Sequence, residues 1–409
     1  MKVGIPFGQA QLDLDVDADG RVEIVSPGNV PPDNGAVARS LTHPLCSPEL
    51  SEFLASREKI LVVINDHTRP TPSADVLREL DLKGKKVTTI VAGGAHRAPS
   101  QPELEKVIGG SIPPYGGNVV VHDSRENSQL RSFGFTERGT QLQFNSRLFD
   151  ADGIIVIGSV EPHYFAGYTG GRKFLLPALA GYRSIEMNHS LALDDASGIL
   201  RLEGNPVHED LMDALNSFDR YDDIFSIQVV LNRHHDISYC VSGHVVDSFN
   251  GAVEHSKEIY VAPIDSKVDI VIAVATRPMD LDLYQSQKAI ENTRPALKDG
   301  GVLILVSPCA DGIGPRAFYD LLISGGDVTG KIREGYRLGY HKAAKLLELQ
   351  RKARLLAVTG LEPNLLSAIS IAPYGDIQDA FKAATDAAGS DSKVLIVMDA
   401  CLTVPLPRI

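Results

Sequence analysis

Short apolar runs alternate along the chain with stretches of helical periodicity. Runs of aliphatic and β-branched residues bounded by polar or glycine residues are typical of buried strands. They cover residues 59–64, 86–91, 119–122, 153–158 and 224–231, and later 268–274, 302–307, 354–358 and 393–398. Residues 1–8 alternate like a further strand, and helical patterns fall at 73–80, from near 102, and at 287–297. This alternation predicts an α/β protein with largely parallel sheets.

The strand and helix series begins afresh in the second half of the chain. A length of 409 residues exceeds the usual size of one domain. Glycine, proline and charged residues interrupt the pattern between residues 250 and 265. We therefore predict two α/β domains, residues 1–255 and 256–409, with an active-site cleft between them. A return of the extreme C-terminus to the first domain is an open alternative.

Composition excludes several classes of protein. Hydrophobic residues make up 43% of the chain and charged residues 22%, which is ordinary globular usage. The formal net charge of −12 argues against a nucleic-acid partner. No apolar run is long enough for a membrane span, and the N-terminus lacks a signal core, so we expect a cytoplasmic protein. The four cysteines are far apart and form no CxxC pair, which argues against a thiolate zinc site and a disulfide framework.

Polar clusters follow the first two strong strands. In the segment Asp66-His67-Thr68-Arg69, the arginine offers a planar fork for a carboxylate, and Asp66 is spaced to orient it. His96 follows the next strand in Gly93-Gly94-Ala95-His96. Ligands of α/β proteins collect at this edge of a sheet. The alternatives are an internally satisfied surface turn and a structural histidine.

A glycine turn and a lysine follow the strand at 153–158. The segment runs from Glu161-Pro162-His163 to Gly170-Gly171-Arg172-Lys173, and His189 comes sixteen residues later. Two glycines let a ligand lie against the backbone, although a plain structural loop is an equal alternative. In the second half, Tyr284 to Lys288 opens a helix where backbone N–H groups and Lys288 favour an anion. A solvated helix start is the alternative there.

Taken in order, these motifs resemble those of the lactate racemase family that uses a nickel-pincer nucleotide. The agreement includes Gly204-Asn205-Pro206 and Gly339-Tyr340-His341-Lys342. The resemblance implies a pyridinium-3-thioamide-5-thiocarboxylic acid mononucleotide that binds nickel through a ring carbon and two sulfurs. By the same resemblance, Lys173 tethers the cofactor and His189 is the protein ligand of nickel. Sulfur and imidazole donors in a plane suit Ni(II).

The resemblance also implies a reaction and the residues that perform it. His96 and His163 match two acid/base residues, one for each hand of a small 2-hydroxy acid. One removes the hydroxyl proton while the C2 hydrogen leaves as hydride, and the 2-keto acid is then reduced on its other face. Further cofactor contacts fall on Asp66, His67, Thr68, Arg69, Gln285 and Lys288, and substrate contacts on Arg69, Tyr284, Lys288 and Phe165. Cofactor-biosynthesis and insertion proteins are the implied partners.

Several readings stay open beside this one. The chain has no tryptophan, so a family pocket wall built from that residue must differ here, and lactate itself becomes doubtful. A zinc hydrolase could use His96, His163 and His189, although no HxH or HExxH spacing occurs. A non-catalytic nucleotide- or carboxylate-binding protein is the other alternative, whereas an NAD dehydrogenase would need a GxGxxG fingerprint. No role is assigned to His122, His208, His234, His235 and His341.

Overall fold

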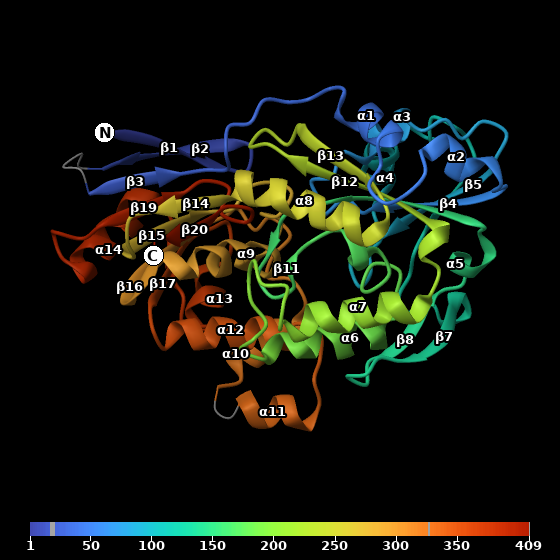
Figure 1. Ribbon diagram of the computed structural model, residues 1–409. Helices are drawn as coiled ribbons and strands as arrows, with labels where there is room; N and C mark the ends of the chain where they lie inside the picture. The colour runs from blue at the N-terminus through green and yellow to red at the C-terminus, as the bar shows by residue number, and fades with distance from the viewer. Residues whose placement is uncertain (17–20, 326–327, 409) are drawn as a thin grey trace. The chain divides into compact units, whose positions relative to one another are not determined.

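A computed structural model of the protein describes residues 1–16, 21–325 and 328–408. The chain divides into two compact units. Unit 1 comprises residues 1–28, 162–164 and 260–409, and unit 2 comprises residues 29–161 and 165–259. Each unit is built on a six-stranded sheet, and both sheets are largely parallel (Figure 1). The predicted fold class is therefore confirmed.

The sheet of unit 2 has the strand order β13-β12-β9-β4-β5-β6. Only the β12–β13 pair is antiparallel. Five of the six strands match predicted runs to within one residue at their ends, because runs this apolar are stable only inside a core, whereas β13 was not predicted. The strands are β4 (Lys59–Asn65), β5 (Lys86–Ala92), β6 (Asn118–Val121), β9 (Gly153–Ser159), β12 (Ile224–Leu231) and β13 (Ile237–Gly243).

Four short helices pack their apolar sides on one face of this sheet. Figure 1 shows them together, and their buried side chains share one core cluster with the strands. They are α1 (Ala36–Thr42), α2 (Leu50–Ala55), α3 (Ser73–Arg78) and α4 (Gln101–Ile108). The sequence pattern predicts Ser73 as the N-cap of α3, but Pro72 holds that position and Ser73 is the first helical residue. Helix α4 instead has a complete capping box formed by Ser100 and Glu103.

The other elements of unit 2 were not predicted from the apolar pattern. A hairpin of β7 (Leu130–Phe135) and β8 (Gln141–Asn145) follows β6, and its first strand is too exposed to show a clear alternation. The other α-helices and strands of unit 2 are α5 (Arg147–Asp150), β11 (Gly167–Tyr168), α6 (Tyr182–Ser190), α7 (Pro206–Phe218) and α8 (Val245–Tyr260), whereas β10 (Pro162–His163) belongs to unit 1.

The sheet of unit 1 is parallel throughout, with the order β18-β17-β16-β15-β19-β3. The β1–β2 hairpin and helix α14 (Ile377–Ala388) pack on one face of it. The strands of unit 1 are β1 (Lys2–Phe7), β2 (Ala10–Asp15), β3 (Val22–Val25), β14 (Val261–Ile264), β15 (Val268–Val274), β16 (Leu297–Val306), β17 (Arg354–Val358), β18 (Ala372–Tyr374), β19 (Val394–Val397) and β20 (Val404–Pro407).

Five further helices complete unit 1: α9 (Leu283–Thr293), α10 (Arg316–Ile323), α11 (Val328–Glu334), α12 (Tyr340–Gln350) and α13 (Pro363–Ser367). Helix α9 begins four residues earlier than the expected 287–297, because the carboxylate of Asp282 caps it by accepting from the Gln285 N–H.

The N-terminal segment packs with the C-terminal half of the chain. Strand β3 pairs in parallel with β19, and Val3, Ile5, Leu14 and Val16 belong to the core of the C-terminal sheet. Residues 1–28 are therefore part of unit 1 and not of a domain 1–255. The division at residues 259/260 does lie close to the expected boundary. Strand β20 pairs with β14, so the C-terminus stays within unit 1.

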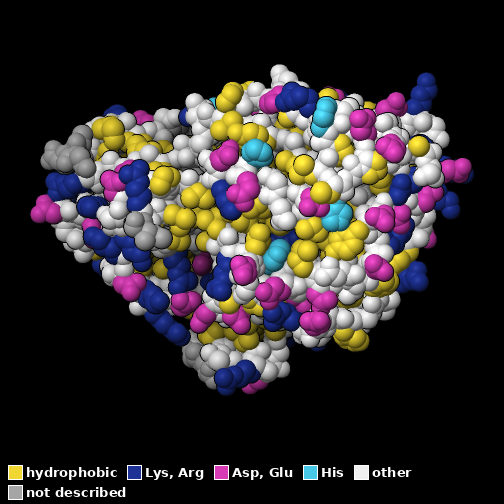
Figure 2. All heavy atoms as spheres, in the orientation of Figure 1, with side chains coloured by type: hydrophobic (Ala, Val, Ile, Leu, Met, Phe, Trp, Pro, Cys, Tyr) yellow, Lys and Arg dark blue, Asp and Glu magenta, His cyan; other side chains and the backbone are white. Residues whose placement is uncertain are grey.

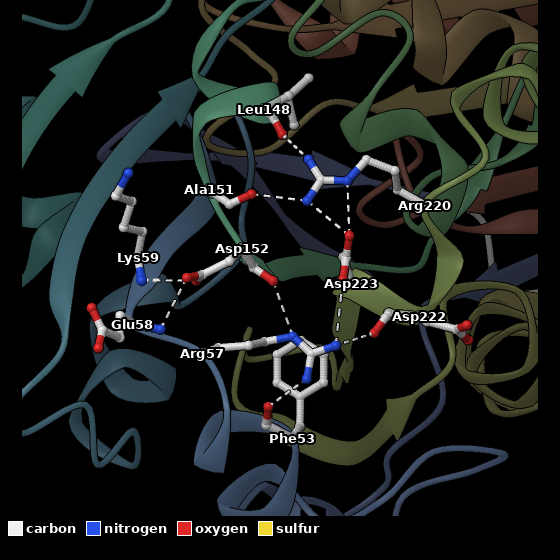
Figure 3. A network of polar contacts seen from close by, with 10 residues as sticks. All are labelled: Phe53, Arg57, Glu58, Lys59, Leu148, Ala151, Asp152, Arg220, Asp222 and Asp223. Atoms are coloured by element: carbon white, nitrogen blue, oxygen red, sulfur yellow. Dashed lines mark hydrogen bonds and ion pairs between the residues drawn. The ribbon is translucent and has the colours of Figure 1, made fainter.

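A polar network ties together the amino ends of three parallel strands of unit 2 (Figure 3). The Asp152 carboxylate, just before β9, accepts from the backbone N–H groups of Glu58 and Lys59 at the start of β4. Arg57 donates to the carbonyls of Phe53, Asp152 and Asp222 and lies over the Phe53 ring. Arg220 donates to Leu148, Ala151 and Asp223. We therefore assign this edge of the sheet a role in stabilising the fold.

The surface carries both signs of charge. Figure 2 shows Lys and Arg side chains interspersed with Asp and Glu over the face in view. Such a mixture differs from the clustered cations that nucleic-acid binding needs. Within the described ranges, no helix combines the length and the apolar character that spanning a membrane requires.

Candidate functional site

The loops that follow β4 and β5 join in one hydrogen-bonded group. The His96 Nδ1 atom lies 2.8 Å from Asp66 Oδ2, and the Thr68 hydroxyl donates to Asp66 Oδ1 at 2.9 Å. Asp66 is buried, whereas the His96 side chain retains 27% of its exposure. Gly93 allows this approach, since a Cβ there would lie 3.2 Å from Asp66 Oδ2. Both loops leave carboxyl ends of parallel strands, as expected.

Asp66 fixes the state of the His96 ring. Burial raises the pKa of Asp66, but the facing His96, the Arg69 charge and the Thr68 hydrogen bond outweigh it and lower the pKa to about 2. An ionised carboxylate accepts hydrogen bonds and donates none, so Nδ1 of His96 carries the proton. The Nε2 atom is then the basic nitrogen. His96 is therefore prepared to accept a proton at Nε2.

The expected partnership of Asp66 with Arg69 takes a different form. The carboxylate is hydrogen-bonded to His96 and Thr68, and Arg69 reaches Asp66 through its backbone N–H, 3.2 Å from the Asp66 carbonyl. Asp66 and Arg69, three residues apart, are therefore joined by a tight turn of the backbone, and the Asp66 carboxylate does not orient the Arg69 side chain. The half-buried Arg69 guanidinium contributes its charge to the site.

His67 points toward helix α4. Its Nε2 atom lies 3.7 Å from Glu103 Oε1, and its side chain is only 6% exposed. Burial lowers the pKa of His67, which favours the neutral ring. The structure thus gives His67 a packing role in the turn, and a cofactor contact by this residue stays a prediction.

The glycine turn before Lys173 is held by close packing. Gly170 and Gly171 have φ angles of +79° and +51°. A Cβ on Gly170 would lie 2.6 Å from Gln228 Oε1, and one on Gly171 would lie 2.6 Å from Phe249 Cβ. The Gln228 amide oxygen accepts from the Gly171 N–H at 2.9 Å. Only glycine fits both positions.

Two residues that support this turn were missed in the sequence. Gln228 is a fully buried polar residue inside the apolar run Ile224–Leu231, and that contrast was a usable signal. Arg172 is also buried and donates to the carbonyls of Ala166 and Gly170 at 2.9 and 3.3 Å. Burial lowers the pKa of Arg172 to about 9. Its guanidinium carbon lies 4.2 Å from the centre of the Phe249 ring. No feature of the local sequence predicted this contact.

Phe165 brings Lys173 and His189 to one place. The Lys173 Nζ atom lies 5.7 Å from the centre of the Phe165 ring, and the His189 ring meets the same ring edge-on at 5.2 Å. The neighbour of His189, Asn188, anchors α6 by donating to Asp210 at 2.8 Å. Lys173 and His189 are half-buried, so a ligand can reach both.

The two groups of unit 2 are adjacent. The Gly94 N–H, two residues before His96, donates to the Ala178 carbonyl at 3.1 Å, five residues after Lys173. A Cβ on Gly94 would lie 3.0 Å from the Pro177 carbonyl oxygen and 3.7 Å from Ile185 of α6. The loop of His96 therefore packs on the chain that connects Lys173 to His189.

The other predicted residues lie in unit 1. His163 is buried and stacks on Tyr164 with ring centres 5.2 Å apart. On α9, the Lys288 Nζ atom lies 3.6 Å from Met279 Sδ. Tyr284 lies under Lys342, whose Nζ atom is 3.8 Å from the ring centre. The helix entrance expected to hold an anion already binds the Asp282 carboxylate, whose pKa burial raises.

No cluster of three or more His, Cys, Asp or Glu side chains in the described part of the chain is arranged to hold a metal ion. Such a cluster is what the zinc hydrolase alternative requires.

The chain is a two-domain α/β protein. Its candidate site combines a histidine–aspartate pair with a lysine on a glycine turn and a second histidine beside that lysine, and proteins of this class are known. Residues 7–199 match the sequence model of the lactate racemase N-terminal domain, and residues 264–404 match that of the lactate racemase C-terminal domain. The chain belongs to the lactate racemase family.

Relatives in this family match over most of the chain. A lactate racemase from Thermoanaerobacterium thermosaccharolyticum is 29% identical over 97% of both chains, and one from Lactiplantibacillus plantarum is 30% identical over 69% of this chain and 68% of its own. The apoprotein structure from the former organism superposes with a TM-score of 0.88 at 27% identity, covering 99% of this chain and all of that one. A Thermotoga maritima protein shares the fold at 18% identity, with a TM-score of 0.75 over 93% of this chain and all of its own.

Proposed function

We propose that this protein is a racemase or epimerase acting at C2 of a small 2-hydroxy acid, with a nickel-pincer nucleotide attached to Lys173. One observation carries the proposal: Lys173 and His189 contact the same ring, that of Phe165, beside a turn that only glycine can form. A primary amine and an imidazole at this spacing are the two protein groups that the cofactor needs.

The residues present fit that group. The Lys173 amine provides the attachment through a thioamide, and the His189 imidazole is a donor that Ni(II) accepts beside sulfur. Gln228 and Phe249 fill the space where side chains of residues 170 and 171 would lie, so the two glycines fix the turn that carries Lys173. When bound, the nucleotide would supply the hydride acceptor for the C2 hydrogen.

The residues of this chain handle the proton and orient the substrate. His96 accepts the hydroxyl proton at Nε2, because Asp66 holds the other ring nitrogen protonated. His163 serves the opposite hand of the substrate in the same way. Arg69 binds the substrate carboxylate through its two parallel N–H groups, with Lys288 and Tyr284 as further contacts.

The similar proteins support a class of substrate and not one particular acid. The relatives named above are lactate racemases, so a short-chain 2-hydroxy acid is the class we propose. Phe165 is buried, with 3% exposure, and it contacts Lys173 and His189, which supports its proposed role beside the side chain of the acid. The absence of tryptophan makes other short-chain acids candidates beside lactate.

The test compares protein produced with and without the cofactor-making enzymes. With them, we expect a mass adduct on Lys173, stoichiometric nickel, and racemisation of at least one acid in a panel of single enantiomers followed by chiral chromatography. Without them, the protein should be folded and inactive. The variants His96→Ala and His163→Ala should keep the adduct and lose racemisation.

Two outcomes would reject the proposal. One is a fully loaded protein that racemises no 2-hydroxy acid of the panel. The other is high activity from protein whose Lys173 is unmodified and which contains zinc, a result that would favour the hydrolase alternative.

A further inference from the structure

The motif Gly339-Tyr340-His341-Lys342 has no part in the function proposed so far, yet His341 is fully buried. Gly339 starts helix α12 with a φ angle of +106°, and a Cβ there would lie 3.2 Å from Phe318 Cβ. The first residue of α12 therefore packs closely against α10, which fixes where the helix starts. The next two residues of interest, His341 and Lys342, both reach Tyr164.

His341 connects two tyrosine hydroxyls. Its Nδ1 atom lies 2.5 Å from the Tyr336 hydroxyl and its Nε2 atom 3.2 Å from the Tyr164 hydroxyl. A neutral imidazole has one donor and one acceptor nitrogen, so one hydroxyl must donate to the ring while the other accepts from it. The three groups therefore form a directional chain of hydrogen bonds within unit 1.

The same groups form a stack of rings that ends at His163. The Tyr336 and His341 rings are 6.1 Å apart at 26°, the His341 and Tyr164 rings 6.5 Å apart at 13°, and the Tyr164 and His163 rings 5.2 Å apart at 19°. Tyr164 and His163 retain 5% and 7% of their exposure. Little space is left in which these rings could turn.

Lys342 holds Tyr164 from a second direction. Its Nζ atom lies 5.3 Å from the Tyr164 ring centre, and it also donates to the Tyr284 carbonyl at the entrance of α9. Two consecutive residues of α12 thus fix the side chain that directly follows His163.

We propose that His341 is a positioning residue for His163: through the Tyr336–His341–Tyr164 chain it fixes the Tyr164 ring, and through that ring the orientation of the His163 imidazole. The inference rests on the proposed role of His163 as an acid/base residue. Orientation matters to such a group because a misplacement of about 1 Å can cost about 100-fold in rate. His341 itself would touch neither substrate nor cofactor.

The first arm of the test needs no cofactor. Histidine side chains are labelled with ¹⁵N in cofactor-free protein, and the His163 and His341 signals are assigned by loss in His163→Gln and His341→Gln. We expect His341 to show a single neutral tautomer. Tyr336→Phe should change the His341 signal and move or broaden that of His163. The matched control Tyr319→Phe, which removes a hydroxyl bonded to the Leu365 carbonyl in the same unit, should leave both unchanged.

The second arm uses protein loaded with its cofactor to equal occupancy. His341→Phe should lower kcat by about 10- to 100-fold while KM stays within about 2-fold, because orientation affects the chemical step and not substrate binding. His341→Gln, which keeps one donor and one acceptor, should recover part of kcat. The control His122→Phe replaces a buried, hydrogen-bonded histidine of unit 2 and should leave kcat and the His163 signal unchanged.

The outcomes separate the two proposals. An unchanged His163 signal in Tyr336→Phe and His341→Gln, or full kcat in those variants, would overturn the positioning role. If the parent protein racemises nothing, the proposed function fails, while the spectroscopic arm still decides whether His341 orients His163. A failure of His341→Phe to fold leaves Tyr336→Phe and His341→Gln to carry the test.

Discussion

The residue with the clearest chemical task in unit 2 is Asp66. It is 4% exposed, and its carboxylate is hydrogen-bonded to His96 and Thr68. A buried ion of this kind persists only because its partners outweigh the cost of burial. Its retained charge selects the His96 tautomer that has a basic Nε2, and so couples the loop after β4 to the loop after β5.

We expect Asp66→Asn to lower kcat by about 10²- to 10⁴-fold with the cofactor still attached, because an amide can donate to Nδ1 and stabilise the wrong tautomer. Chiral chromatography on protein matched for adduct content measures the loss. The exposed carboxylate Asp75, paired with Arg78 on α3, supplies the control Asp75→Asn. Equal rates for the two variants would remove Asp66 from this role.

His208 makes the stability of unit 2 depend on pH. Burial, with the charge of Arg172 as a smaller cause, lowers the pKa of His208 from 6.5 to about 3. Below pH 6.5 the unfolded chain binds a proton that the folded chain does not, so folding stability is lost as the pH falls from 6.5 toward 3. The contribution is about 1.4 kcal/mol per pH unit in that window.

The variant His208→Gln should therefore show a pH dependence of the unfolding free energy that is shallower by about 1.4 kcal/mol per unit between pH 4 and 6. Urea unfolding at several pH values tests this. The exposed His43→Gln is the control, and identical slopes for His208→Gln and the parent would contradict the prediction.

At the scale of elements, the two edges of the unit 2 sheet have different tasks. The carboxyl ends of β4, β5 and β9 lead to the loops of Arg69, His96 and Lys173, respectively, whereas the amino ends of β4, β9 and β12 are tied by the network of Arg57, Asp152 and Arg220 (Figure 3). In a parallel sheet all amino ends meet at one edge, so stability and chemistry can be separated in this way.

Arg57→Ala should lower the unfolding free energy by about 2–3 kcal/mol, since three backbone carbonyls lose their donor and the contact with the Phe53 ring is lost. The rate per loaded site should not change. The control is Arg78→Ala, which breaks an exposed ion pair of about 0–1 kcal/mol. Equal midpoints in urea for the two variants would show that the network contributes little.

At the scale of the whole molecule, the first 28 residues complete the C-terminal unit. Strand β3 covers the edge of β19, and Ile5 is fully buried among residues of β15, β16 and β19. An uncovered edge strand beside an open apolar face would invite association between chains. The chain ends therefore meet in one unit although they are far apart in sequence.

Ile5→Ala should destabilise unit 1 by about 2–4 kcal/mol, the cost of a cavity in a packed core. Amide hydrogen exchange should accelerate in β15 and β16 and not in β4 and β5. Ile24→Ala, at a position with 42% exposure, should cost less than about 1 kcal/mol. Faster exchange in β4 and β5 instead would contradict the placement of the N-terminal segment.

The sequence by itself determined the elements that depend on local pattern. Strands β4, β9, β12, β15 and β17 were predicted almost to the residue, because a run of apolar β-branched side chains has few stable alternatives to a buried strand. The glycine turn and the residues grouped at strand ends were also visible, since both follow from backbone chemistry and from the polarity of parallel sheets.

Tertiary structure decided which groups became partners. Asp66 was three residues from Arg69, yet its carboxylate bonds His96, thirty residues away. The N-terminal strands looked like part of the first domain, and Arg172, Gln228 and His341 had no assigned task until their distant contacts were known. Local spacing governs the backbone, whereas a buried polar side chain takes whichever partner the packed core brings within about 3 Å.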